Sequence, residues 1–71
     1  MYVKGMKVRM TQEAIDFYGE DKKSNPKGVI GECIGIDDMH ACAGEIWYGV
    51  KWPNGYNIYQ DGELIVVEDA Q

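Results

Sequence analysis

Apolar and polar residues alternate along most of the chain with the two-residue period of β-strands. Residues 6–10 read MKVRM, so the three apolar side chains fall on one face and the two basic ones on the other. Residues 46–52 (IWYGVKW) alternate in the same way. Residues 29–36 are rich in β-branched and apolar residues, and the glycines among them are typical of a bulge or bend. With the short apolar segments 56–59 and 64–67, the pattern predicts five strands.

Helical periodicity occurs once, directly after the first predicted strand. Thr11 can cap a helix over residues 12–19, in which Ala14, Ile15 and Tyr18 share one face. Gly19 is a natural stop. Two turns of helix are too short to be stable alone in water, so we expect this helix to pack on the sheet.

Loops and turns separate these elements. Residues 20–27 (EDKKSNPK) carry mostly charged side chains and are predicted to form a loop, and residues 37–44 are predicted to form a turn or a second loop. Asn54-Gly55 lies between two strand-like segments, a strong signal for a two-residue hairpin turn in which Gly55 has a positive φ. Residues 60–63 are predicted to form another tight turn.

Five short strands in 71 residues are too few for a two-layer sandwich of normal size. We therefore predict an all-β fold, a small, strongly bent five-stranded barrel with one short helix after the first strand. The chain is expected to be a single domain, residues 1–71, with its core in residues 6–67. Val8, Ile15, Val50 and Leu64 are predicted to meet in that core.

The charge pattern bears on partners. Seven basic and twelve acidic residues give a net charge of −5, distributed as +2 over residues 1–30 and −7 over residues 31–71. The acidic second half repels phosphate, which argues against nucleic acid as the partner. No apolar segment approaches the roughly 20 residues of a membrane helix, and the amino terminus lacks a signal-peptide core. A cytoplasmic protein that does not enter a membrane is expected.

Several residues resemble those of known small barrels. Val50-Lys51-Trp52-Pro53-Asn54-Gly55, followed by Tyr59 and Leu64, resembles the V-x-W-D-x-G…Y…L ending of Mind-bomb/Herc-type SH3-like barrels. Residues 8–15 and 28–31 are similar to the V-R-L-T-x-E-A and G-x-V-x-G segments of small SH3-like proteins of phage and bacteria. The resemblance implies an SH3-like barrel with a binding or accessory role. Pro53 replaces the usual Asp, and the motifs of proline-binding SH3 domains are not present.

Candidate chemistry is sparse. Cys33, His40 and Cys42 are the only soft metal ligands, whereas a structural zinc site needs four ligands in closely spaced pairs. We expect no metal and interpret Cys33 as a small buried apolar residue. His40 has no orienting partner in the sequence, and the glycines follow no phosphate-binding pattern. The sequence therefore predicts a protein that is not an enzyme and needs no cofactor.

Aromatic residues are the better functional candidates, because five of them fall within residues 47–59. A small barrel cannot bury them all, and alternation sends Trp47 outward if Trp52 points inward. The predicted binding surface is aromatic and acidic and consists of Trp47, Tyr56, Glu45 and Asp61. It suits another protein as partner. Two alternatives remain open: a Tudor- or KOW-like nucleic-acid accessory that uses the basic residues of the first half, and an acidic inhibitor of a host enzyme.

Overall fold

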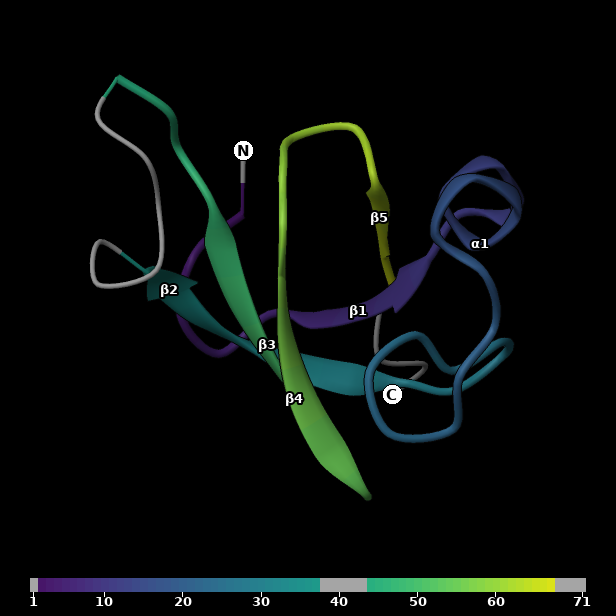
Figure 1. The fold of residues 1–71 in the computed structure, drawn as a ribbon. Coiled ribbons are helices and arrows are strands. Elements are labelled where there is room, and N and C mark those ends of the chain that lie inside the picture. Colours follow the sequence, from purple (N-terminus) through teal and green to yellow (C-terminus); the bar gives the residue numbers. More distant parts are fainter. Residues whose placement is uncertain (1, 38–43, 68–71) are drawn as a thin grey trace.

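The computed structural model describes residues 2–37 and 44–67 and contains the five strands and the helix that the sequence predicts (Figure 1). The elements in chain order are β1 (Lys7–Met10), α1 (Gln12–Tyr18), β2 (Gly31–Ile36), β3 (Tyr48–Trp52), β4 (Gly55–Tyr59) and β5 (Leu64–Val66). All strand pairs are antiparallel, and the strand order is β4-β3-β2-β1-β5. The fold is therefore mostly β, with one short helix.

The sheet is strongly curled. β4 and β5 lie at its opposite edges, which would be roughly 19 Å apart in a flat five-stranded sheet. Only residues 60–63 connect them, and five Cα steps span at most about 18 Å when fully extended. The connection also turns, since the Glu63 N–H donates to the Gln60 carbonyl at 3.2 Å. The sheet must therefore curl, although within the described residues no strand pairing joins β4 to β5, so the predicted barrel is present only as an open, curled sheet.

A bulge in β2 contributes to this curvature. The pairing of β2 with β3 shifts register between Cys33 and Gly35, which leaves Ile34 as the extra residue. Gly35 has a φ of 99°, a conformation that residues with a Cβ rarely adopt. The bend that the glycines of this segment predict is thus confirmed.

The core lies inside the curl. The four residues predicted to meet there, Val8, Ile15, Val50 and Leu64, are all buried and belong to one hydrophobic cluster. Trp52 is the largest side chain in it and is 1% exposed. Its ring packs against Gly31, where a Cβ would collide with the indole.

Helix α1 is capped as the sequence predicts. The Thr11 hydroxyl accepts a hydrogen bond from the Ala14 N–H at 3.0 Å, and Gly19 ends the helix with a φ of 90°. Ala14 and Ile15 are buried against the sheet, whereas Tyr18 is partly exposed and donates to the Glu63 carboxylate at 2.6 Å. The helix is thus anchored to the turn between β4 and β5.

Hydrogen bonds attach the segment 20–27 to strand β4. Asn25 is buried within this predicted loop, and its side-chain oxygen accepts from the Asn57 amide at 3.1 Å. The Tyr59 hydroxyl donates to the Ser24 carbonyl and accepts from the Trp52 indole N–H, the latter at 3.0 Å. Buried polar groups need such partners, so this network holds the segment against β4.

Gly55 does not have the positive φ that the sequence predicts, although this position does require glycine. Trp52 pairs with Gly55, so the turn consists of Pro53 and Asn54, and Gly55 does not have a positive φ. Glycine is required because a Cβ at this position would overlap the Lys23 carbonyl group. The constraint is thus a close backbone approach between the segment 20–27 and β4.

Gly55→Ala is expected to destabilise the protein by about 1–3 kcal/mol, because the added methyl group must displace the backbone at Lys23. Urea unfolding followed by fluorescence measures the effect. Asn54→Ala, in the exposed turn next to it, is the control and should change the midpoint little. Equal midpoints for the Gly55→Ala variant and the parent would contradict the close approach.

The amino-terminal segment extends the core beyond the predicted boundary at residue 6. Tyr2 is buried, and its ring packs edge-on against Tyr48 with the centroids 5.0 Å apart. Its hydroxyl donates to the Leu64 carbonyl at 2.8 Å and accepts from the Gly62 N–H at 3.0 Å. Tyr2 therefore covers part of the open edge of β5, where unpaired backbone groups would otherwise face solvent.

Candidate functional site

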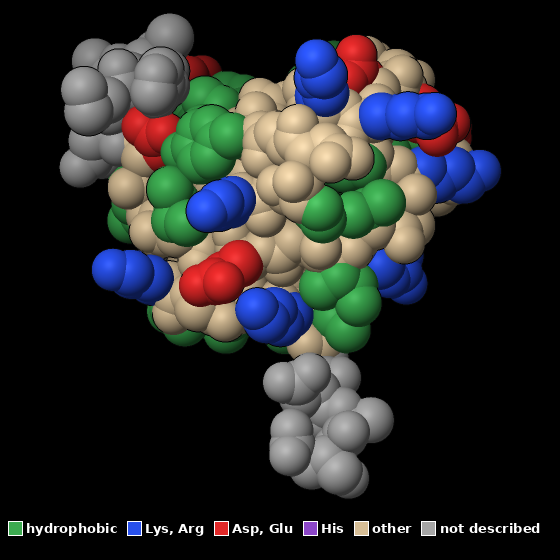
Figure 2. Space-filling view, turned by 90° about the horizontal axis from the view of Figure 1, so that it is seen from below, with side chains coloured by type: hydrophobic (Ala, Val, Ile, Leu, Met, Phe, Trp, Pro, Cys, Tyr) green, Lys and Arg blue, Asp and Glu red, His purple; other side chains and the backbone are tan. Residues whose placement is uncertain are grey.

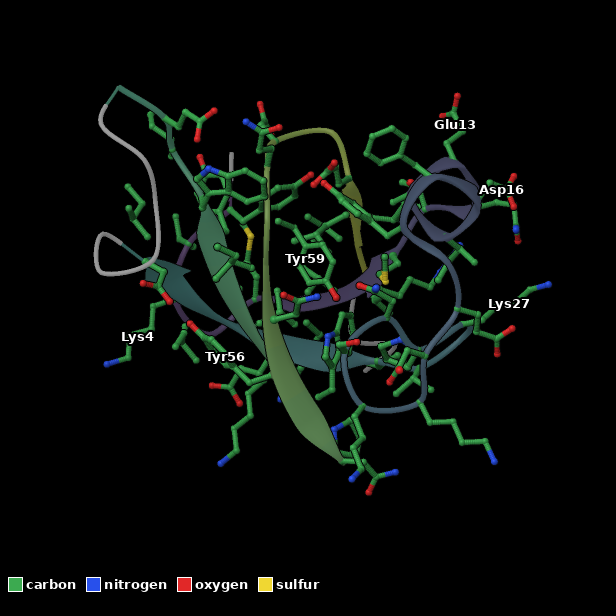
Figure 3. The ribbon with its side chains drawn as sticks, viewed as in Figure 1. Lys4, Glu13, Asp16, Lys27, Tyr56 and Tyr59 are labelled. Atoms are coloured by element: carbon green, nitrogen blue, oxygen red, sulfur yellow. The ribbon has the colours of Figure 1, made fainter. Side chains whose placement is uncertain are left out.

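Tyr56 projects from β4 on the outer face of the sheet, as labelled in Figure 3, and is 39% exposed. Its hydroxyl lies over Gly49, where any Cβ would overlap it, and donates to the Asp37 carboxylate. Partial burial, followed by this hydrogen bond and the charge of Asp37, raises the pKa of Tyr56 to about 12. The hydroxyl therefore stays protonated at physiological pH and remains bound to Asp37.

Trp47 immediately precedes β3 and is partly exposed, while Trp52 is buried, as alternation predicts for these two residues. Ile46, which alternation places with Trp52, is 57% exposed. The Trp47 indole N–H donates to the Glu45 carboxylate at 3.0 Å. The Trp47 carbonyl accepts from the Asp37 N–H at 2.8 Å. Asp37 thus contacts Trp47 through its main chain and Tyr56 through its side chain.

The fourth predicted residue, Asp61, is exposed in the turn between β4 and β5. Because Tyr48 pairs with Tyr59, the segment before β3 runs beside the segment after β4. Trp47 and Asp61 therefore come from adjoining segments at the same end of the β3–β4 pair. Tyr56 is connected to this end of the strand pair by its hydrogen bond to Asp37.

Sequence reasoning missed the residues that complete this surface. Asp37 is the first residue of the predicted loop 37–44, and it holds two parts of the surface together. Ile34 lies beside Tyr56, because its side chain and the Tyr56 hydroxyl both lie over Gly49. Ile36 and Ile46, which precede Asp37 and Trp47 in the chain, are 56% and 57% exposed. We call the following set the Tyr56–Trp47 surface: Ile34, Ile36, Asp37, Glu45, Ile46, Trp47 and Tyr56. The register shift in β2 leaves Ile34 as the bulged residue on this surface.

The metal-type residues fall only partly within the described chain. Cys33 is a free, fully buried thiol whose sulfur accepts from the Gly35 N–H at 3.4 Å, which confirms its interpretation as a small core residue. His40 and Cys42 lie outside the described residues. Within residues 2–37 and 44–67, no group of three or more metal-binding side chains comes together.

The helix in the described part of the chain is too short to cross a membrane.

Comparison with known proteins identifies no relative of this chain. No protein-family model, no curated protein and no solved structure matches this chain. The function must therefore be inferred from the surface itself.

Proposed function

We propose that the protein is a small, non-catalytic binding module of the SH3-like type, and that its Tyr56–Trp47 surface binds a segment of another protein. The segment carries Lys or Arg beside apolar side chains. The observation that supports this is the pair of hydrogen bonds from Tyr56 to Asp37 and from Trp47 to Glu45. These bonds fix the polar ends of both rings and set a carboxylate beside each.

The chemistry of the surface suits such a partner. Aromatic rings offer large contact area with few rotatable bonds, and fixing them in advance lowers the entropy lost on binding. The neighbouring carboxylates and ring faces attract a cationic side chain. The exposed Ile34, which lies beside the Tyr56 hydroxyl over Gly49, provides the apolar part of the contact.

The SH3-like assignment and the rejection of the inhibitor alternative rest on separate observations. The curl of the sheet and the glycine bulge in β2 support an SH3-like architecture. An acidic inhibitor would need carboxylates free to meet a basic groove. Here Glu32 and Glu63 are each bound to a side chain of this protein, namely Lys7 and Tyr18. Docking is therefore the better-supported function.

Selection from a displayed library of random peptides tests the proposal. The enriched peptides should combine Lys or Arg with apolar residues. Trp47→Ala should weaken their binding roughly 30-fold or more, the scale of an interface hot spot. Phe17→Ala, which removes the 80%-exposed ring on α1, is the matched control and should leave binding unchanged.

The two tryptophans provide the readout by NMR. On adding an enriched peptide, the indole N–H signal of Trp47 should shift, whereas that of the buried Trp52 should move little. Failure to enrich any peptide would contradict the proposed function. Equal binding by the Trp47→Ala variant would remove the Tyr56–Trp47 surface from it.

A further inference from the structure

The basic side chains gather on one face of the molecule (Figure 2). Lys4 and Lys27 project from opposite sides of the fold, so the face spans its width (Figure 3). We call the following exposed residues the basic face: Lys4, Lys7, Arg9, Lys22, Lys23, Lys27 and Lys51. Among the described residues, only one of these cations forms an ion pair: the Lys7 ammonium lies 3.4 Å from the Glu32 carboxylate, and both side chains are about half exposed. Most of the positive charge on this face is therefore free to meet an anionic ligand.

The strands and their register create a first hollow on this face. Lys7 lies opposite Glu32, which lies opposite Lys51, so two lysines flank one carboxylate across β1, β2 and β3. The hollow has a volume of about 350 Å³, and Ile30 and Pro53 contribute apolar walls to it. Cationic and apolar side chains thus line the same concave surface.

A second hollow lies next to the first. It has a volume of about 290 Å³, and its charged lining residues are Lys22, Lys27 and Glu20. Val29, Pro26 and Asn54 complete the lining. Val29 and Asn54 are the chain neighbours of Ile30 and Pro53, which line the first hollow, so the two share a wall. The hollows therefore follow one another across the basic face.

Buried contacts hold the second hollow in place. The segment 20–27 carries Lys22, Lys23 and Lys27, and Asn25 in its middle is fixed to Asn57 on β4. The backbone of Lys23 packs directly on Gly55. These lysines are thus held beside the β3–β4 turn, whose Pro53 and Asn54 line the first and the second hollow.

The net charge of −5 does not exclude an anionic ligand here. The molecule measures 36 × 28 × 21 Å, whereas the Debye length at physiological salt is about 8 Å. Carboxylates on the far side are therefore largely screened from a ligand on the basic face. The local charge decides binding, and the argument from the acidic second half of the sequence loses its force.

We propose that the basic face binds single-stranded nucleic acid, with phosphates at Lys7, Lys51, Lys22 and Lys27 and bases against the apolar walls of the two hollows. Consecutive hollows that combine cationic and apolar side chains match a polymer that alternates phosphates with flat bases. A membrane surface is flat, and two concave sites offer it little contact. This binding site shares no residue with the Tyr56–Trp47 surface but adjoins it, because Lys51 pairs with Tyr56 across β3 and β4.

Fluorescence anisotropy with a labelled oligothymidylate tests the proposal. The protein should bind it at low salt and lose affinity as salt rises. In Lys7→Gln/Lys51→Gln, the slope of log K against log salt should become shallower by about 1.4, because each lost phosphate contact on a single strand contributes about 0.7. Glu32→Gln should bind more tightly, because it removes the carboxylate that pairs with Lys7.

Trp47→Ala is the control, since it should lose peptide binding but keep the oligonucleotide. Unfolding curves for all variants show whether the fold is retained. No binding at low salt, or equal salt slopes for the parent and the double lysine variant, would overturn the proposal. Binding to phosphatidylserine vesicles without binding to oligothymidylate would also overturn it. Loss of the oligonucleotide in the Trp47→Ala variant, with its fold retained, would refute separate sites.

Discussion

Trp52→Ala is expected to unfold the protein under ordinary conditions. The indole is the largest buried side chain, packs on Gly31 and donates to the Tyr59 hydroxyl at 3.0 Å. Truncating a buried aromatic residue costs about 3–5 kcal/mol. That is most of the roughly 5 kcal/mol available to a small domain. The variant should also release the segment 20–27, because the indole and the Tyr59 hydroxyl belong to the network that holds it.

Circular dichroism and NMR measure the effect, through loss of the cooperative thermal transition and of dispersed amide signals. Trp47→Ala is the control. It removes the same kind of side chain from a partly exposed position, and it should keep both the transition and the dispersion. If Trp47→Ala collapsed the fold and Trp52→Ala left it intact, the inside and outside of β3 would be reversed.

Leu64→Ala is the second large effect, with an expected loss of about 2–5 kcal/mol. The leucine side chain is 5% exposed and belongs to the hydrophobic cluster, while its backbone is bound to the Tyr2 hydroxyl. Its truncation leaves a cavity beneath the edge of the sheet, where few neighbours can move in to fill it. Chemical unfolding gives the loss of free energy directly.

Ile65→Ala provides a matched control on the same strand. Ile65 is 38% exposed on the outer face, so its truncation removes an aliphatic side chain with a much smaller loss of burial. Similar losses for both variants would show that β5 stabilises the protein only as an edge strand, and that Leu64 has no special place in the core.

The network around Asp37 shows why the site was only partly predictable. Alternation along residues 46–52 was enough to place Trp52 inside and Trp47 outside, because strand neighbours must face opposite ways. The role of Asp37 was not predictable from its place in a polar loop. Its partner Tyr56 is 19 residues away, and they meet only because β2 and β4 flank β3 in a curled sheet.

Gly55 is a second residue whose role depends on a distant segment of the chain. The Asn54-Gly55 pair predicts that Gly55 is required because it has a positive φ. The position does require glycine. The reason is the Lys23 backbone, which comes from a distant segment of the chain. No pattern within a few residues of Gly55 carries that information.

The sequence by itself determined the features that depend on neighbours along the chain: the number of strands, the position of the helix and its caps at Thr11 and Gly19, and the residues that face the core. Each follows from side-chain periodicity or backbone preference over a few residues. Only the tertiary structure decided how far the sheet curls, that Tyr2 reaches Leu64 across 62 residues, and that the lysines gather on one face. Those features depend on contacts between segments that are distant in the sequence, and such contacts form only when the chain folds.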